Sequence, residues 1–256
     1  MSKNRYFIRK MVLAAAMVSV LQLTACSAIP EKQVGELPAL HSVESVVSED
    51  VTYAIDVYDP FEGFNRGMYR FNAGFDHYIF LPVVGAYESV MPGFAEKGVS
   101  NFFNNLFEIT NLTNSILQLK PKATIATTER IIVNTTIGVV GLFDVATTMG
   151  IYEHEEDFGQ TLGHYGVGSG PFIVLPILGP SNLRDTTGTI VDSVTMASID
   201  PLNLDEHSER ELVFYLLNAI DDRHTTAFRY YDSGSPFEYE LIRKLYTEKR
   251  KLDIKR

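Results

Sequence analysis

The stretch from Asp59 to Phe80 reads DPFEGFNRGMYRFNAGFDHYIF and carries two parallel stripes of side chains. Within each stripe the residues recur at steps of three and four, which return to one face of an α-helix because 3.6 residues make a turn. We therefore predict a helix here, and we expect Pro82 to end it. The apolar stripe consists of Phe61, Phe64, Met68, Phe71 and Phe75, and the polar stripe consists of Asn65, Tyr69, Asn72 and Asp76.

Each stripe has two interpretations. The apolar face is either ordinary protein core or a surface buried in acyl chains. The polar face is either exposed to solvent or the lining of a wet passage. The sequence leaves both pairs open, because core and acyl chains both hide a side chain from water. Regular stripes on one helix suit an element with lipid on one side and water on the other.

The rest of the chain has helical rather than alternating periodicity. Pro121 breaks the second predicted helix and can begin the next one at its first turn. Ser235–Glu238 reads SPFE, a capping box that opens a basic final helix. We predict a mainly α single domain over residues 59–256, with amphipathic helices over residues 94–119, 121–137, 183–198, 205–231 and 235–256.

One apolar run interrupts this helical pattern. Residues 170–180 read GPFIVLPILGP and follow the glycine-rich GHYGVGSG. A plain buried strand is one interpretation; a mobile hairpin that touches lipid is the other. Glycines supply hinge freedom and prolines oppose docking as a strand, and Ser181 or Asn182 would cap the helix that follows. The glycines and prolines of this segment are Gly166, Gly168, Gly170, Pro171 and Pro176, followed by Gly179 and Pro180.

The N-terminus reads as a bacterial lipoprotein signal. Residues 1–25 contain four basic and no acidic side chains and an apolar stretch from Met11 to Leu23, which is too short to span a bilayer. The segment ends in LTAC, so we predict cleavage before Cys26 and acylation of that residue. Two or three acyl chains would anchor the protein firmly. Ser27 in place of Asp favours export to the outer membrane, and residues 26–58 are expected to form a flexible, lipidated tether.

Charge and cysteine content exclude several classes of function. Removing residues 1–25 changes the formal net charge from −10 to −14, which argues against nucleic-acid binding. Adhesion to anionic lipid by charge alone is excluded for the same reason, so membrane association must be hydrophobic. Cys26 is the only cysteine, so no intrachain disulfide is possible.

Motifs for chemistry are weak. The GVGSG turn precedes a segment that cannot open a regular helix, and no phosphate-binding loop occurs. Ser169 does not sit in a nucleophile elbow. His154, His164 and the acids between them lack the order of a zinc motif, so a solvated acidic loop is the simpler interpretation. We expect no enzyme activity, no metal and no cofactor other than covalent lipid on Cys26.

Several segments in order resemble the MlaA/VacJ family of outer-membrane lipoproteins. They are DPFEGFNRGMYRFN, NFFNNLFEITNLTNSILQ, RIIVNTTIGVVGLFDVA, and EDFGQTLGHYGVGSGPFIVLPILGPSNLRDTTG followed by VDS. The likeness covers Asp59 to about Asp200. Two departures are visible: many members have proline near Ile109, so this helix is expected to run on here, and many have tyrosine at Phe172.

This resemblance implies a single ring-like or disc-like helical domain in the periplasmic leaflet of the outer membrane beside a trimeric porin. Phospholipids misplaced in the outer leaflet would pass through its channel to the periplasmic carrier MlaC, which maintains lipid asymmetry. A structural lipoprotein that braces a porin is the alternative, and a lipid-cleaving enzyme is a distant third. The residues expected to line the channel or meet headgroups are Asn65, Tyr69, Asn72, Asp76, Arg184 and Asp185. The hairpin residues expected to gate this channel are Gly166, Gly168, Gly170, Pro171 and Pro176.

Overall fold

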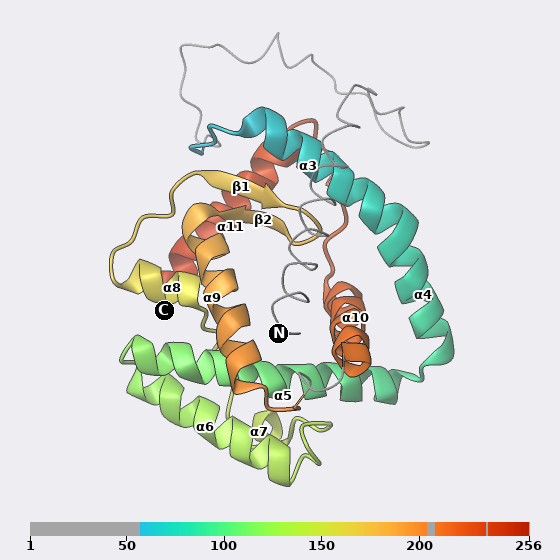
Figure 1. The fold of residues 1–256 in the computed structure, drawn as a ribbon, viewed down its shortest axis with the longest axis vertical. Helices are drawn as coiled ribbons and strands as arrows, with labels where there is room; N and C mark the ends of the chain where they lie inside the picture. Colours follow the sequence, from blue (N-terminus) through green and yellow to red (C-terminus); the bar gives the residue numbers. More distant parts are fainter. Residues whose placement is uncertain (1–56, 204–207, 234, 256) are drawn as a thin grey trace, which may run out of the picture. The chain divides into compact units, whose positions relative to one another are not determined.

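The computed structural model describes residues 57–203, 208–233 and 235–255, which all belong to one compact unit, Val43–Arg256 (Figure 1). The predicted signal segment, Cys26 and the tether up to residue 56 lie outside the described residues. The described part is mainly helical, as the sequence predicted. Its elements are α3 (Glu62–Phe75), the π-helix η1 (Asp76–Phe80), α4 (Leu81–Val90), α5 (Gly93–Leu117), α6 (Pro121–Thr136), α7 (Val145–Thr148), α8 (Phe158–His164), β1 (Phe172–Leu175), β2 (Gly179–Asn182), α9 (Leu183–Ile199), α10 (Ser208–Thr225) and α11 (Glu238–Lys255).

The first helix does not end at Pro82, which corrects the sequence prediction. α3 passes into η1, and α4 continues directly from it with Pro82 in its first turn. Proline is tolerated there because the wide π turn changes the hydrogen-bond register, and the Leu81 N–H reaches the Asp76 carbonyl. Figure 1 shows the resulting uninterrupted helical path from α3 to α4.

α5 and α6 form a helical hairpin. α5 runs through Ile109 without a break, as expected from the absence of proline there. Leu119 takes a φ of 56° in the connection, and Pro121 begins α6 with its ring in the first turn. Both predictions about this region are confirmed.

The apolar run forms a two-stranded antiparallel sheet, so the expectation that its prolines prevent strand docking is wrong. Phe172 pairs with Asn182 and Val174 pairs with Pro180. The N–H of Val174 points away from β2, to the Asn65 side chain. Val174 and Pro180 therefore form a non-hydrogen-bonded pair of the antiparallel ladder. Because neither residue donates to the other strand at such a pair, the missing N–H of proline removes no hydrogen bond from the sheet.

Contacts connect the elements in a circuit. α4 packs on α10, α10 on α5, α5 on α9, α9 on β2, and β1 on α3. This circular order agrees with the ring of elements expected from the family resemblance. The apolar core within it is small and centres on Tyr69, Phe172, Val174 and Tyr239. Edge-to-face aromatic contacts hold it, including Phe172 with Tyr239 at 6.1 Å between ring centroids.

The start of the final helix, α11, differs from the capping box that the sequence predicted. The Ser235 hydroxyl accepts a hydrogen bond from the Phe237 N–H at 3.1 Å, but α11 begins at Glu238. The Glu238 carboxylate turns away from the helix end and accepts hydrogen bonds from the Tyr69 hydroxyl and the Ser233 hydroxyl, both at 2.6 Å. It thereby connects α11 to the polar stripe of α3.

Candidate functional site: a polar interior behind an apolar exterior

The polar stripe of α3 faces inward and holds the β-hairpin. The Asn65 amide donates to the Phe172 carbonyl at 3.0 Å and accepts from the Val174 N–H at 2.9 Å. The Asn72 amide repeats this pattern two turns later, donating to the Leu175 carbonyl and accepting from the Ile177 N–H, both at 2.8 Å. Two asparagine side chains thus act as a partner strand for the free edge of β1.

The other two members of the stripe are paired as well. The Tyr69 hydroxyl donates to Glu238, and the Asp76 carboxylate receives the Arg223 guanidinium, with one contact at 2.8 Å. All four side chains are buried. Their polar atoms bond to protein groups, so the interpretation of this stripe as solvent-exposed surface is wrong, whereas its lining of a channel stays a prediction. A role for them in headgroup contact stays a prediction.

Arg184 and Asp185 lie together in a second buried network between α9, α8 and α11. The Asp185 carboxylate accepts hydrogen bonds from Arg184 and from Arg250, each at 2.8 Å. Arg250 also donates a hydrogen bond to the Asp157 carboxylate at 2.7 Å. Burial alone raises the pKa of Asp185, but the hydrogen bonds and charges of Arg250 and Arg184 outweigh it and hold that pKa below its ordinary value. Asn182 caps α9 by accepting from the Asp185 N–H, which confirms one of the two predicted caps.

A third network fills the space between α5 and α6. The Arg130 guanidinium pairs with the fully buried Glu108 and donates to the Ile151 carbonyl at 2.8 Å. The Gln118 amide donates to Glu156 at 2.7 Å, and Lys120 pairs with the same carboxylate. Glu108, Gln118 and Arg130 are charged or polar residues and yet are among the least accessible in the described chain, which is rare unless each is hydrogen-bonded. The sequence reading missed this network, because Glu108 and Arg130 lie far apart in the chain.

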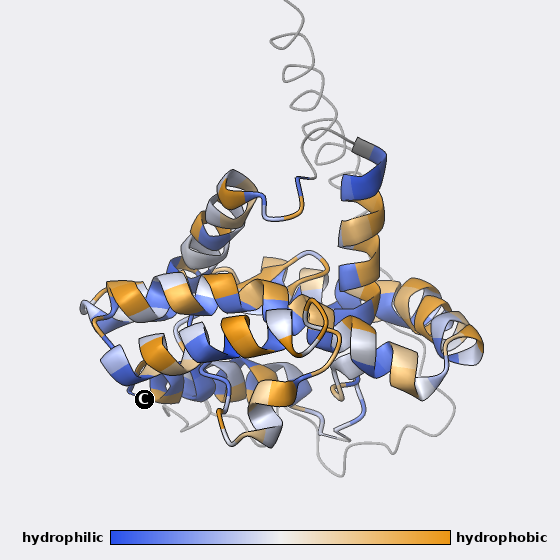
Figure 2. Ribbon diagram, turned by 90° about the horizontal axis from the view of Figure 1, so that it is seen from below, coloured by the Kyte–Doolittle hydropathy of each residue, from blue (hydrophilic) through white to orange (hydrophobic). Residues whose placement is uncertain are grey.

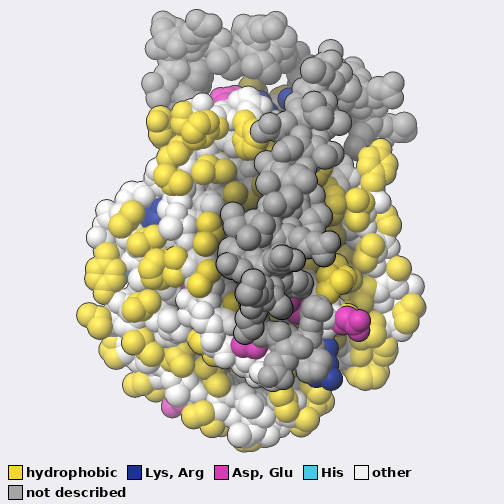
Figure 3. Space-filling view, viewed as in Figure 1, with side chains coloured by type: hydrophobic (Ala, Val, Ile, Leu, Met, Phe, Trp, Pro, Cys, Tyr) yellow, Lys and Arg dark blue, Asp and Glu magenta, His cyan; other side chains and the backbone are white. Residues whose placement is uncertain are grey.

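The exterior has the opposite character. Phe64 of the apolar stripe is 60% exposed, whereas Asn65 beside it is 0% exposed. Apolar side chains project outward on each helix from α3 to α6 and from α9 to α11, and Figures 2 and 3 show hydrophobic residues along the helices and over much of one face. Representative exposed residues are Phe64, Val90, Phe94, Leu119, Ile125, Ile132, Ile190, Val194, Leu212, Leu216 and Leu252.

Burial is therefore inverted relative to a protein surrounded by water. Among the described residues, the largest side chains that are fully buried include only one apolar one, Val174; the others are Gln118, Glu108, Asn65, Asn114, Thr127 and Ser115. Scattered apolar residues on a surface need no explanation, but an apolar exterior over a polar interior does. Hydrocarbon as the surrounding solvent explains both features. Among the described residues no helix is long and apolar enough to span a bilayer.

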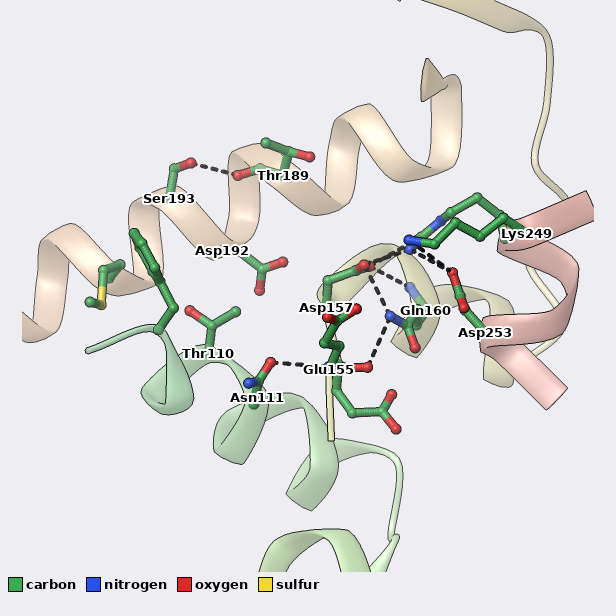
Figure 4. A pocket seen from close by; sticks show the side chains of 14 residues that line it. Thr110, Asn111, Glu155, Asp157, Gln160, Thr189, Asp192, Ser193, Lys249 and Asp253 are labelled. Carbon is green, nitrogen blue, oxygen red and sulfur yellow. Dashed lines mark hydrogen bonds and ion pairs between the residues drawn. The ribbon is translucent and has the colours of Figure 1, made fainter. Parts of the chain in front are cut away.

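A pocket of about 350 Å³ opens between α5, α8, α9 and α11 (Figure 4). Asn111, Asp157 and Asp192 point into it from three elements, and Lys249 and Asp253 border it from α11. Burial raises the pKa of Asp192, with the charge of Asp157 adding to the effect. Phe107 and Met196 line another part of the wall, so the pocket combines charged and apolar groups.

The predicted gating residues adopt different backbone states. Gly166 and Gly170 have φ values of 87° and 68°, in the region that favours glycine, whereas Gly168 does not. Pro171 accepts a hydrogen bond from the Leu183 N–H at 3.1 Å, and Pro176 begins the turn between the strands. A gating role for these five residues stays a prediction.

Comparison with known proteins identifies relatives of this arrangement. The family model described as MlaA lipoprotein matches residues 57–253. An uncharacterized protein of Rickettsia typhi is 38% identical over 170 residues, 66% of either chain. The proteins named intermembrane phospholipid transport system lipoprotein MlaA are 42% identical over 138 residues in Escherichia coli K12 and 41% over 140 residues in Shigella flexneri. These alignments cover 52% and 53% of this chain and 55% and 56% of those relatives.

A solved structure shares the fold. Its description reads "Structural basis for maintenance of bacterial outer membrane lipid asymmetry". It superposes on this chain with a TM-score of 0.64, and the two sequences are 32% identical. The superposition covers 77% of this chain and 100% of that one. The sequence alignments span about two thirds or less of the curated relatives they match. The chain belongs to the MlaA lipoprotein family.

Proposed function

We propose that this protein is an outer-membrane lipoprotein that returns phospholipids misplaced in the outer leaflet to the periplasm. The inverted burial carries the proposal: the polar side chains bond to one another inside, and the apolar exterior fits the acyl chains of the periplasmic leaflet. The named relatives belong to an intermembrane phospholipid transport system, which supports the same role.

The energetics explain why such a protein is needed. A phospholipid has about 30 methylenes, each worth about 0.8 kcal/mol of burial, so free escape into water costs on the order of 20 kcal/mol. Moving its charged headgroup through hydrocarbon is costly too. A protein with polar groups inside an apolar shell lowers the second cost, and a carrier protein docked beside it lowers the first.

The anchor and partners complete the proposal. Acylation of Cys26 holds the protein to the periplasmic leaflet of the outer membrane, a trimeric porin binds beside it, and the soluble carrier MlaC receives the lipid. The chain itself catalyses no reaction, and no cofactor takes part beyond the covalent lipid. Since the sequence contains no phosphate-binding loop, the driving force comes from another component.

Purification in mild detergent distinguishes the alternatives. We expect phospholipid to co-purify with the protein and to exchange with added labelled phospholipid. Porin binding without lipid, together with an intact permeability barrier in a deletion strain, would instead support a structural brace. Release of lysophospholipid from added substrate would establish a lipid-cleaving enzyme.

A further inference from the structure

The connection between α6 and α7 contains two valines in an unfavourable backbone conformation. Val139 and Val140 have φ values of 54° and 58°, and Gly141 follows at 86°. Glycine adopts such angles freely, but a β-branched residue does so at a cost and is a rare outlier. Consecutive outliers persist where the surrounding structure imposes them, often at a functional surface.

The unusual angles direct the backbone N–H groups inward. The Val140 N–H donates to the Thr135 carbonyl at 2.9 Å, and the Gly141 N–H donates to the Asn134 carbonyl at 2.8 Å. The Phe143 N–H closes the segment onto the Gly138 carbonyl at 2.9 Å. Six of the seven N–H groups from residue 137 to residue 143 donate to backbone carbonyls of the chain. A surface loop ordinarily leaves such donors to water.

The segment is also fixed against α5. The Asn101 amide donates to the Leu142 carbonyl at 3.1 Å. A Cβ atom at Gly141 would lie 2.6 Å from the Asn105 side chain, and one at Gly138 would lie 2.2 Å from the Phe143 carbonyl oxygen. Both glycines are therefore required by close contact, and the loop is held in one preformed shape.

The outer side of this loop is apolar and uncharged. Ile137, Val139, Val140 and Phe143 are each more than half exposed. No charged residue occurs between Arg130 and Asp144, and those two side chains pair with each other at 3.4 Å beneath the loop. Val139 and Val140 are each more than half exposed, so packing within the chain offsets their backbone cost only in part, and a contact outside the chain would supply the rest.

The backbone pattern selects hydrocarbon as that contact. Water would favour glycine or polar residues at these angles, and a protein interface would ordinarily use some of the backbone donors. A lipid layer requires the opposite, namely apolar side chains over a backbone whose hydrogen bonds are satisfied internally. We propose that residues 137–143, here called the wedge loop, insert into the boundary between headgroups and acyl chains and fix the depth of the protein in the leaflet. This inference rests on the proposed membrane location.

Tryptophan fluorescence tests the wedge loop, because the chain contains no tryptophan. Two reporters, Ile137→Trp and Phe143→Trp, mark its ends without altering the strained valines. Tyr152→Trp is the matched control, since Tyr152 is similarly exposed but lies in the acidic segment before α8. The full-length lipoprotein variants are reconstituted in phosphatidylethanolamine–phosphatidylglycerol vesicles without any partner protein, and quenching by brominated acyl chains is compared with quenching by acrylamide.

We expect both wedge-loop reporters to show blue-shifted emission, to lose most of it to brominated lipid and to resist acrylamide, whereas Tyr152→Trp does the reverse. Acrylamide quenching of both reporters without an effect of brominated lipid would overturn the proposal and would leave a protein partner as the cover of the loop. Phe64→Trp on α3 separates this outcome from failure of the proposed function. If brominated lipid quenches Phe64→Trp alone, the membrane location stands and only the wedge loop is wrong; if it quenches neither site, both proposals fail.

Discussion

At the residue scale, the two stripes of α3 show what a sequence pattern can and cannot determine. The spacing of Phe64, Asn65, Phe71 and Asn72 predicted which residues share a face, and the structure confirms it. It did not determine which face is inward, because acyl chains and a protein core both remove a side chain from water. The structure decides this through the hydrogen bonds of Asn65 and Asn72 to the hairpin, which connect residues more than one hundred positions apart.

Replacing Asn65 tests the substitute-strand role directly. Asn65→Leu leaves the Phe172 carbonyl and the Val174 N–H buried without partners, at about 1–3 kcal/mol for each group. We expect a large fall in the free energy of unfolding, measured by denaturant titration in detergent. Asn104→Leu is the control, because Asn104 is exposed on α5. Equal stability of the two variants would contradict the role of Asn65.

The Arg250 network predicts a pH dependence of stability. The pKa values of Asp157 and Asp185 are lowered in the folded protein, chiefly because Arg250 overcomes the effect of burial. A lowered folded pKa stabilises the protein above the unfolded value of about 4 and loses that contribution as the pH falls below it. Arg250→Gln should reduce stability at neutral pH and move the acid transition to higher pH, since both carboxyl pKa values rise when Arg250 no longer opposes the effect of burial. An unchanged acid transition would show that Arg250 does not control them.

At the scale of elements, local signals were strong where one residue type decides the geometry. Pro121 and the Asn182 cap placed helix starts correctly. The predictions made from Pro82 and Pro180 were wrong. The π turn of η1 accommodates the missing N–H of Pro82, and Pro180 lies in a non-hydrogen-bonded pair of the hairpin, where no N–H is needed. Neither accommodation has a recognisable sequence pattern, since each depends on contacts with the residues around it.

The hairpin glycines give a matched pair of substitutions. Gly170 has a φ of 68°, and a Cβ there would lie 3.1 Å from the Leu183 side chain, whereas a Cβ at Gly168 would meet nothing within 4 Å. We expect Gly170→Val to lower stability by roughly 1–3 kcal/mol and to lower abundance, and Gly168→Val to leave both nearly unchanged. If Gly168→Val nevertheless reduces lipid transport per folded molecule, hairpin movement is part of transport. Equal loss of abundance in both variants would contradict this account of the hairpin.

At the scale of the whole molecule, the apolar exterior should be dispensable for folding and required in the membrane. Ile125 and Ile132 project from α6 and are more than half exposed. Changing both to Asp should leave the thermal midpoint in detergent nearly unaltered, because neither side chain contributes to the core. The same change should weaken insertion into vesicles and lipid transport, since charged groups are costly among acyl chains. Asn104→Asp is the control for added charge. Loss of folding in detergent would show instead that this face is buried against protein.

The central claim is that an inverted protein of this kind removes phospholipid from the outer leaflet. The most direct measurement is the amount of phospholipid exposed at the cell surface in a strain that lacks the protein, compared with the same strain carrying the wild type or the Ile125→Asp/Ile132→Asp variant. The account predicts that surface phospholipid rises on deletion, returns to normal with the wild type and stays raised with the variant at equal abundance. An unchanged level of surface phospholipid on deletion, with the protein still bound to its porin in the wild-type strain, would contradict it.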